Sequence, residues 1–176
     1  MRMVEVRPAS EGEYGEVVGF YRELIESMRE SEFMPEWEMG VYPTESMLKK
    51  AVEKRELYVA HMGDELIGAM ILNRECEPAY DTVEWRTDAK KGEIMAIHLL
   101  GVARARQGKG VAKRMIAKAA EIGKNDLLKA IRLDVLRKNF PAAKMYESAG
   151  FIYIDSVRMY YKDTGLADFL LYELAL

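Results

Sequence analysis

The segment 94–112 constrains the fold more than any other part of the chain. Residues 94–102 are apolar on both faces, which is typical of a central strand covered on both sides. They lead into a turn with Gly108 and Gly110, and helical periodicity covers 108–123. The first N–H groups of a helix have no internal partner and lie at the positive end of its dipole. This order of strand, glycine turn and helix predicts a site for phosphate or pyrophosphate.

Basic side chains are concentrated around this turn, although the chain as a whole is slightly acidic. The net charge is −3, with 26 basic and 29 acidic residues, so we expect no nucleic-acid partner. The charged residues from 104 to 118 are all basic: Arg104, Arg106, Lys109, Lys113, Arg114 and Lys118. A local basic cluster in an acidic chain indicates a discrete anion site.

Two common nucleotide-binding loops do not fit the turn. A Walker A loop needs Lys and then Ser or Thr after its last glycine, but Val111 follows Gly110. The dinucleotide pattern G-x-G-x-x-G would need glycine at position 113, which is Lys113. A plain turn before a helix would also carry two glycines, so the rest of the chain must decide.

The remaining pattern predicts a single α/β domain, residues 1–176, with a mixed sheet. The other expected strands are 4–7, 57–62, 65–73, 130–136, 151–161 and 168–174. Helices are expected after Ser10, after Thr44 and over 139–149, because Ser10 with Glu13 has capping-box spacing and Thr44 is a good N-cap. The loop 31–43 is rich in large side chains, and either packs on the core or forms a wall of a substrate pocket.

Two motifs resemble the GNAT superfamily of acetyl-CoA-dependent N-acetyltransferases. Gln107, Gly110 and Ala112 fit the loop pattern Gln/Arg-x-x-Gly-x-Gly/Ala; a register two residues earlier would put Ala105 at its first position. The segment 139–151 is similar to the ending Asn-x-x-Ala-x-x-x-Tyr-Glu-x-x-Gly-Phe. The resemblance covers about 57–161 well and the N-terminal helices only in outline.

The resemblance implies a mostly antiparallel sheet of six to seven strands, with helices on both faces and splayed central strands. It also implies acetyl-CoA as the cosubstrate, with its pantetheine arm in the gap between the splayed strands and its pyrophosphate on the amides of 107–112. The implied coenzyme-binding residues are Leu100, Gly101, Val102, Gln107, Gly108, Lys109, Gly110, Val111, Ala112, Lys113, Asn139, Pro141, Ala142 and Tyr146.

The resemblance makes Tyr146 the candidate general acid for the coenzyme A thiolate; otherwise Tyr146 is an ordinary core aromatic. His98 is the candidate base, because a histidine on the equivalent strand occurs in a GNAT member, serotonin N-acetyltransferase. On a regular strand His98 would share a face with Leu100 and Val102, so a satisfied core histidine is the alternative. Glu93 is the second candidate base. Glu84, Asp134 or water alone are weaker alternatives, and Asp134 could instead pair with Arg132 or a helix lysine.

We therefore expect an enzyme that transfers an acetyl group from acetyl-CoA to a primary amine by direct attack in a ternary complex. The acceptor is a small molecule or a protein amino group that the sequence does not identify. Its specificity is expected from the segments 33–42, 75–92 and 153–168. The alternatives are a non-catalytic acyl-CoA sensor of the same fold, or a nucleotide-binding or interaction protein.

Further expectations concern metals, compartment and assembly. One cysteine and two histidines give no metal site, and Cys76 is a poor nucleophile between two glutamates. Nothing approaches the ~20 apolar residues of a membrane span, and residues 1–7 do not resemble a secretion signal. We expect a cytoplasmic protein without membrane contact. The apolar segment 169–176 suggests a homodimer in which a second copy covers it in part.

Overall fold

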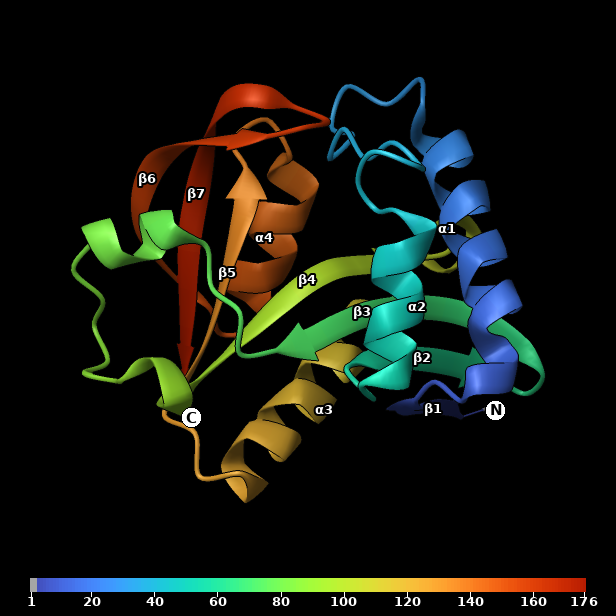
Figure 1. The fold of residues 1–176 in the computed structure, drawn as a ribbon, viewed down its shortest axis with the longest axis horizontal. Helices are drawn as coiled ribbons and strands as arrows, with labels where there is room; N and C mark the ends of the chain where they lie inside the picture. Colours follow the sequence, from blue (N-terminus) through green and yellow to red (C-terminus); the bar gives the residue numbers. More distant parts are fainter. Residues whose placement is uncertain (1–2) are drawn as a thin grey trace.

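The computed structural model describes residues 3–176, which form seven strands, four α-helices and four short 3-10 helices (Figure 1). The strands are β1 (Val4–Pro8), β2 (Leu57–Met62), β3 (Glu65–Asn73), β4 (Ile94–Val102), β5 (Ala130–Leu136), β6 (Ile152–Tyr161) and β7 (Gly165–Ala175). The α-helices are α1 (Tyr14–Met28), α2 (Glu45–Glu53), α3 (Val111–Asn125) and α4 (Phe140–Ser148). The 3-10 helices are η1 (Glu11–Glu13), η2 (Pro78–Thr82), η3 (Lys91–Glu93) and η4 (Arg104–Arg106).

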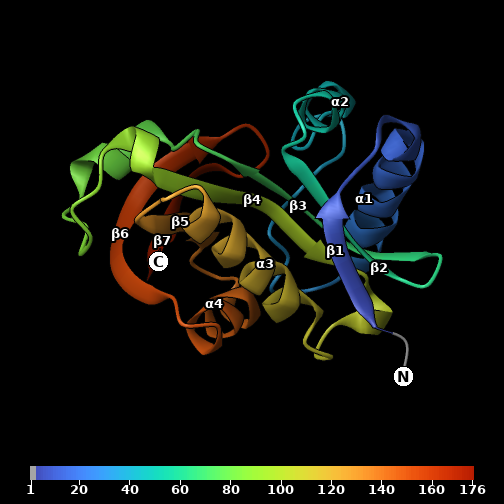
Figure 2. The same cartoon turned by 90° about the horizontal axis from the view of Figure 1, so that it is seen from below.

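All seven strands belong to one sheet with the order β1-β2-β3-β4-β5-β7-β6. Neighbouring strands are antiparallel except β4 and β5, which are parallel. Helices α1 and α2 cover one face, and α3 and α4 cover the other (Figure 2). The predicted mixed, mostly antiparallel sheet with helices on both faces is confirmed. No helix within residues 3–176 is long and apolar enough to cross a membrane.

The helix starts follow the capping residues that the sequence contains. The backbone N–H of Ser10 donates to Glu13 Oε2 at 2.7 Å, in a capping box that leads through η1 into α1. Thr44 Oγ1 accepts from the N–H of Met47 and caps α2. Helix α3 begins at Val111, three residues later than its periodicity predicts. The delay arises because Gly108 and Gly110 have positive φ angles of 72° and 79°, outside the helical region.

A bulge in β4 changes which side chains share a face. His98 lies opposite Ile71 but Gly101 lies opposite Ala69, so β4 has one extra residue there, and Leu99 has a φ of 53°. Leu100 and Val102 consequently pack in the core under α3 and α4, whereas Leu99 packs under α1 and α2. The expectation that His98 shares a face with Leu100 and Val102 is therefore wrong, because the bulge reverses the alternation after His98.

The central strands β4 and β5 pair over only three residues each. The parallel ladder joins Ile94–Ala96 to Ala130–Arg132, and beyond it the strands diverge (Figure 1). The predicted splay is confirmed, and residues 97–102 have no strand partner on the β5 side.

The apolar segment 169–176 lies mainly in β7, between β5 and β6. Phe169, Leu171 and Tyr172 are buried by their own chain. The hydrophobicity that suggested a homodimer is thus accounted for within the fold.

Candidate functional site

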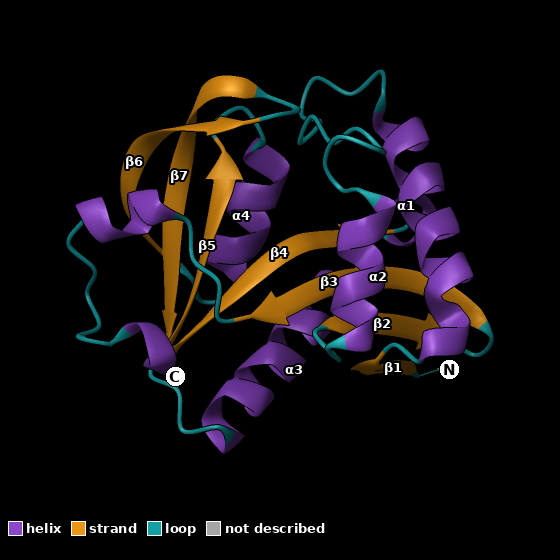
Figure 3. Ribbon diagram, viewed as in Figure 1, coloured by secondary structure: helices purple, strands orange, loops and turns teal. Residues whose placement is uncertain are grey.

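One large cavity begins where β4 and β5 diverge. Its volume is about 780 Å³, within the range of roughly 300–1,000 Å³ that is usual for ligand sites. One end, called here the glycine-turn end, is lined by residues of 104–113 and by α4. The other, the carboxylate end, is lined by Trp37, Tyr42, Asp134, Tyr161 and Asp163. The loop between α1 and α2, which supplies Trp37 and Tyr42, is mostly irregular (Figure 3).

The glycine-turn end presents the start of α3 to the cavity. Gly110 is the N-cap of α3, and a side chain added there would meet no atom within 4 Å, so a ligand can approach its backbone. Gln107 Nε2 donates to the carbonyl oxygen of Val102 at 3.0 Å and ties the turn to the end of β4. Every predicted coenzyme-binding residue lines the cavity except Lys109, whose Nζ donates to the carbonyl oxygen of Ala105.

Basic side chains surround the same end of the cavity. Arg104, Arg106 and Lys113 contribute to its lining, as do Lys144 and Ser148 from α4, two residues for which the sequence carries no functional signal. Arg106 forms an ion pair with Glu65, and the guanidinium of Arg104 donates to the carbonyl oxygen of Ser27. The predicted anion site therefore has open helix-start amides and cations together.

Tyr146 faces the cavity from α4. Its ring packs edge to face on Phe151, with centroids 5.5 Å apart, and burial raises the pKa of its phenol above the ordinary value. Asn139 Oδ1 accepts from the N–H of Ala142 at 3.3 Å, so Asn139 caps α4 while it also lines the cavity.

His98 lines the cavity from β4 with one ring nitrogen engaged. Its Nε2 lies 3.0 Å from both Asn73 Oδ1 and the carbonyl oxygen of Glu75. Because the Glu75 carbonyl only accepts, we assign the ring proton to Nε2, which leaves a lone pair on Nδ1. Burial lowers the pKa of His98 below its ordinary value, so the ring is neutral at pH 7.

Glu93 lies outside the cavity lining, before the first residue of β4. Its Oε2 accepts from the backbone N–H of Lys90 at 2.9 Å and pairs with Lys129 Nζ at 3.0 Å. These partners hold the pKa of Glu93 below its ordinary value. The structure does not bring Glu93 together with Tyr146 and His98, because the cavity reaches β4 only from Ile97 onward.

Asp134 does reach the cavity, and its partners were not anticipated. Its Oδ2 accepts hydrogen bonds from the hydroxyls of Tyr80 at 2.8 Å and Tyr161 at 3.2 Å. Burial raises the pKa of Asp134, and the two hydroxyls oppose that rise. Arg132, one of the partners considered for it, pairs instead with Glu173 at 2.9 Å.

Of the three segments expected to determine acceptor specificity, two line the cavity and one does not. Phe33, Pro35, Trp37 and Tyr42 line the cavity, and so do Tyr161, Asp163 and Thr164. The segment 75–92 contributes no lining residue, but it supports the site from behind, through Tyr80. Trp85 of that segment lies under Arg132, whose guanidinium carbon is 4.1 Å from the ring centroid.

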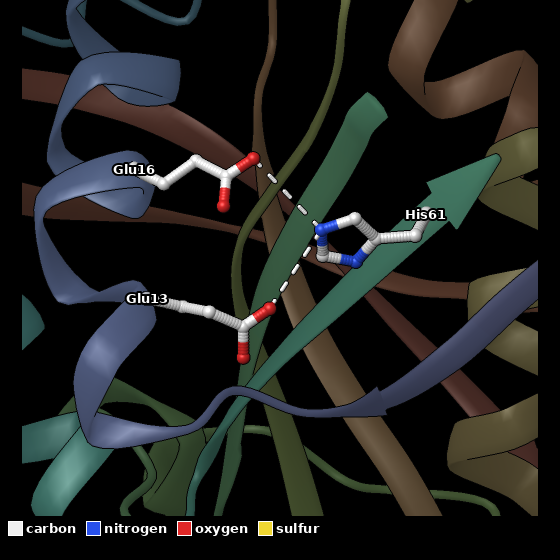
Figure 4. A group of neighbouring side chains, drawn as sticks. All are labelled: Glu13, Glu16 and His61. Carbon is white, nitrogen blue, oxygen red and sulfur yellow. Dashed lines mark ion pairs between the residues drawn. The ribbon is translucent and has the colours of Figure 1, made fainter. Parts of the chain in front are cut away.

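Glu13, Glu16 and His61 form a second group of titratable side chains, between the start of α1 and β2 (Figure 4). His61 Nε2 lies 3.7 Å from Glu13 and 3.9 Å from Glu16. Arg7 already binds both carboxylate oxygens of Glu13, at 2.7 and 2.9 Å, and lowers its pKa to about 2. Because Arg7 already binds both oxygens of Glu13, we interpret the group as polar contacts around the Arg7–Glu13 ion pair, which joins β1 to the start of α1.

Comparison with known proteins gives the family. Residues 13–151 match the model of the acetyltransferase (GNAT) family. A search of curated proteins found no match. Among solved structures, NAA60 of Arabidopsis thaliana in complex with acetyl-CoA has a TM-score of 0.73 at 16% identity, covering 99% of both chains.

Two bacterial structures are similar to the same degree. The protein yncA of Salmonella typhimurium, with its cofactor acetyl-CoA, has a TM-score of 0.71 at 13% identity, covering 99% of this chain and 94% of its own. A GNAT acetyltransferase of Listeria monocytogenes has a TM-score of 0.71 at 22% identity, covering 98% and 95%. At such identities the structures support the fold alone.

The fold is shared with these acetyltransferase structures, and the comparisons cover 94% or more of their own chains. The family match extends over most of the chain, and the chain belongs to the GNAT family of acetyltransferases.

Proposed function

We propose that this protein transfers an acetyl group from acetyl-CoA to a primary amine by direct attack in a ternary complex. The observation that carries the proposal is the continuity of one cavity, from the open amides at the start of α3 to Tyr146 and His98. Two structural neighbours are complexes with acetyl-CoA, which supports the same cosubstrate here.

The lining residues suit successive parts of the coenzyme. The pyrophosphate would lie on the amides of 107–112, where the helix dipole and Lys113 favour negative charge. The pantetheine arm would follow Leu100, Gly101 and Val102, which have no strand partner on the side toward β5. The coenzyme would thereby bind the free strand edge through backbone hydrogen bonds, as an added strand does.

The reaction requires a neutral amine and a stabilised leaving thiolate. An alkyl ammonium ion with a pKa of about 10.4 costs roughly 4–5 kcal/mol to deprotonate at pH 7. His98 Nδ1 would accept this proton, directly or through water. The amine nitrogen then forms a bond to the thioester carbon, the carbon–sulfur bond breaks, and its electron pair leaves on sulfur. A second proton leaves the nitrogen, and the thiolate takes one up.

Two groups are placed to stabilise charge during this step. The bulge leaves Leu99 and Leu100 without a partner in the β3 ladder, so a backbone N–H there can donate to the carbonyl oxygen as negative charge develops. Tyr146 is the proposed donor to the thiolate. Because burial raises its pKa, the phenol stays protonated and available as a donor.

Thermal unfolding with acetyl-CoA, ATP or NAD is the first test. A ligand at about 100 times its dissociation constant adds roughly 2.7 kcal/mol to the free energy of unfolding. For a chain of this size the melting temperature should rise by roughly 5–10 °C. We expect that rise with acetyl-CoA and not with the other two ligands. No shift at millimolar acetyl-CoA would contradict the assignment of 107–112 and, with it, the proposed reaction.

A further inference from the structure

The carboxylate end of the cavity contains two carboxylates that the protein leaves without a cation. Acidic groups elsewhere are often paired, as Glu173 is with Arg132 and Asp168 with Arg137. No ion pair from a described lysine, arginine or histidine reaches Asp134 or Asp163. Arginines and lysines that line the cavity, such as Arg106 and Lys113, gather at the opposite, glycine-turn end.

Both carboxylates are held where a negative charge is costly. Asp134 faces the cavity and is otherwise enclosed by protein, and Asp163 is half-buried in the turn between β6 and β7. Removing an ionised carboxylate from water without a charged partner is unfavourable. Burial accordingly raises the pKa of both groups, and no neighbouring cation lowers either one. A positively charged ligand would supply the missing partner.

The hydrogen bonds of Asp134 also favour a positively charged ligand. Both tyrosine hydroxyls bind Oδ2, and no described residue donates a hydrogen bond to Oδ1. A hydrogen-bond donor in the cavity can therefore reach Oδ1 without displacing a protein group. An ammonium ion has three such donors and a full charge, and it suits an open carboxylate oxygen.

The aromatic ring of Tyr42 lies near both carboxylates. Burial raises the pKa of Tyr42, and the nearby negative charges of Asp134 and Asp163 raise it further. Its ring centroid is 6.0 Å from that of Tyr161. Asp163 and Trp37 also line a second cavity, so Asp163 lies where the two cavities adjoin, whereas Asp134 lines the first one alone. Aromatic faces beside two anions favour a cationic chain.

We propose that the acceptor is a diamine-like dication, with its reacting amine at Asp134 and a second ammonium group at Asp163. The proposal rests on the proposed acetyl transfer, and it adds the class of acceptor. It concerns recognition of the substrate; the proton of the reacting ammonium leaves as described above. The distribution of charge in the cavity then matches its two substrates, an anionic coenzyme and a cationic acceptor.

The test compares α,ω-diaminoalkanes with n-alkylamines of equal chain length, from three to six carbons, in acetyl transfer by the whole protein. At one chain length or more, we expect kcat/KM for the diamine to exceed that for the monoamine by roughly tenfold, or about 1.4 kcal/mol. Asp163→Asn should reduce this ratio to near one. Asp134→Asn should raise KM for both series. Asp64→Asn, in the turn between β2 and β3, is the matched control and should leave both series unchanged.

Equal kcat/KM for diamines and monoamines at every length would overturn the proposal, as would an Asp163→Asn variant that keeps the ratio. An Asp134→Asn variant that lowers kcat without raising KM would make that residue a proton acceptor and overturn its binding role. Calorimetric titration of 1,4-diaminobutane into the coenzyme A complex gives a second readout, and absence of binding there would also count against the proposal. Failure of acetyl-CoA itself to bind, or of every amine to react, would instead refute the underlying function.

Discussion

Tyr146 and His98 line the cavity from opposite sides of the sheet. Tyr146 comes from α4, whereas His98 lies on β4 before the bulge. Burial acts on both, raising the pKa of the phenol and lowering that of the imidazole. At neutral pH the phenol therefore stays protonated and the imidazole stays neutral. These are the states that a hydrogen-bond donor to sulfur and an acceptor of the amine proton require.

Replacing Tyr146 by phenylalanine removes the hydroxyl and keeps the ring that packs on Phe151. We expect kcat to fall on the order of 100-fold, as is common when a proton donor is lost. The dissociation constant for acetyl-CoA, measured by calorimetry, should stay within about twofold, because the ring contacts persist. Tyr160→Phe, at an exposed position on β6 outside the cavity lining, is the control. Unchanged turnover in Tyr146→Phe would remove its assigned role and favour a binding module.

Substituting His98 by glutamine should change how kcat/KM depends on pH on the acidic side of neutrality. A base works in its neutral form, so kcat/KM of the wild type should fall as the pH drops through the pKa of His98, below about 6.5. His98→Gln should have a lower plateau and lack this descent. The glutamine amide can still donate to Asn73, which limits structural damage. His61→Gln should keep the wild-type profile, and a descent that survives in His98→Gln would assign it to another group.

Single residues could be predicted only where their role depends on nearby sequence. The segment 139–151 indicated both Asn139 and Tyr146 through its resemblance to a family motif, which is a local pattern. Asp134 was only a weak candidate because its partners, Tyr80 and Tyr161, are 54 and 27 residues away. Glu93 was a candidate base because of its place next to the start of strand β4. Its contacts with the backbone of Lys90 and with Lys129 hold it outside the cavity lining.

At the scale of elements, strands and helices followed from periodicity and caps, and the irregular parts did not. Strand β4 was expected at its observed bounds, yet nothing in 94–102 marks the bulge at Leu99. The bulge depends on the β3 ladder and on packing against α1, where the Tyr21 hydroxyl donates to the carbonyl oxygen of Leu99 at 2.8 Å. The late start of α3 has a local cause, because two glycines with positive φ precede it.

Gly110→Ala tests the turn that starts α3. The positive φ of Gly110 should cost an alanine about 1 kcal/mol, although the added methyl group meets no neighbour. We expect a melting temperature lower by roughly 2–4 °C. Acetyl-CoA should bind roughly tenfold more weakly, since the methyl group stands where the phosphates approach. Gly15→Ala in α1, which also has free space but an ordinary φ, should stabilise the protein and leave binding unchanged. Equal affinity in Gly110→Ala would contradict the phosphate assignment.

At the scale of the whole molecule, the short contact between β4 and β5 determines where the cavity lies. Strands β1–β4 and β5–β7 meet in a ladder of three residue pairs, and the cavity occupies the place of further pairs. The overall architecture was predictable because the motifs at 107–112 and 139–151 resemble those of the GNAT superfamily, and that resemblance implied a splayed sheet. The composition of the carboxylate end was not, because it combines loops and strands that are distant in sequence.

Amide hydrogen exchange should detect this arrangement. In the free protein, N–H groups of residues 97–102 that point toward β5 have no strand partner and should exchange faster than those of β5, which pairs with β7. Saturating acetyl-CoA should slow the exchange of 97–102 selectively, measured by mass spectrometry or NMR. The hairpin of β2 and β3 serves as the internal reference, because its pairing does not involve the cavity. Slowing that is uniform over the sheet would indicate global stabilisation without an added strand edge.

The incomplete ladder has a mechanical consequence. If the coenzyme binds along the free edge of β4, the two halves of the sheet are joined by three residue pairs when the cavity is empty and by a longer contact when it is filled. The reactant would then be a temporary part of the framework, and the stiffness of the molecule would vary through each catalytic cycle. Release of coenzyme A would loosen the joint between the halves until the next acetyl-CoA binds.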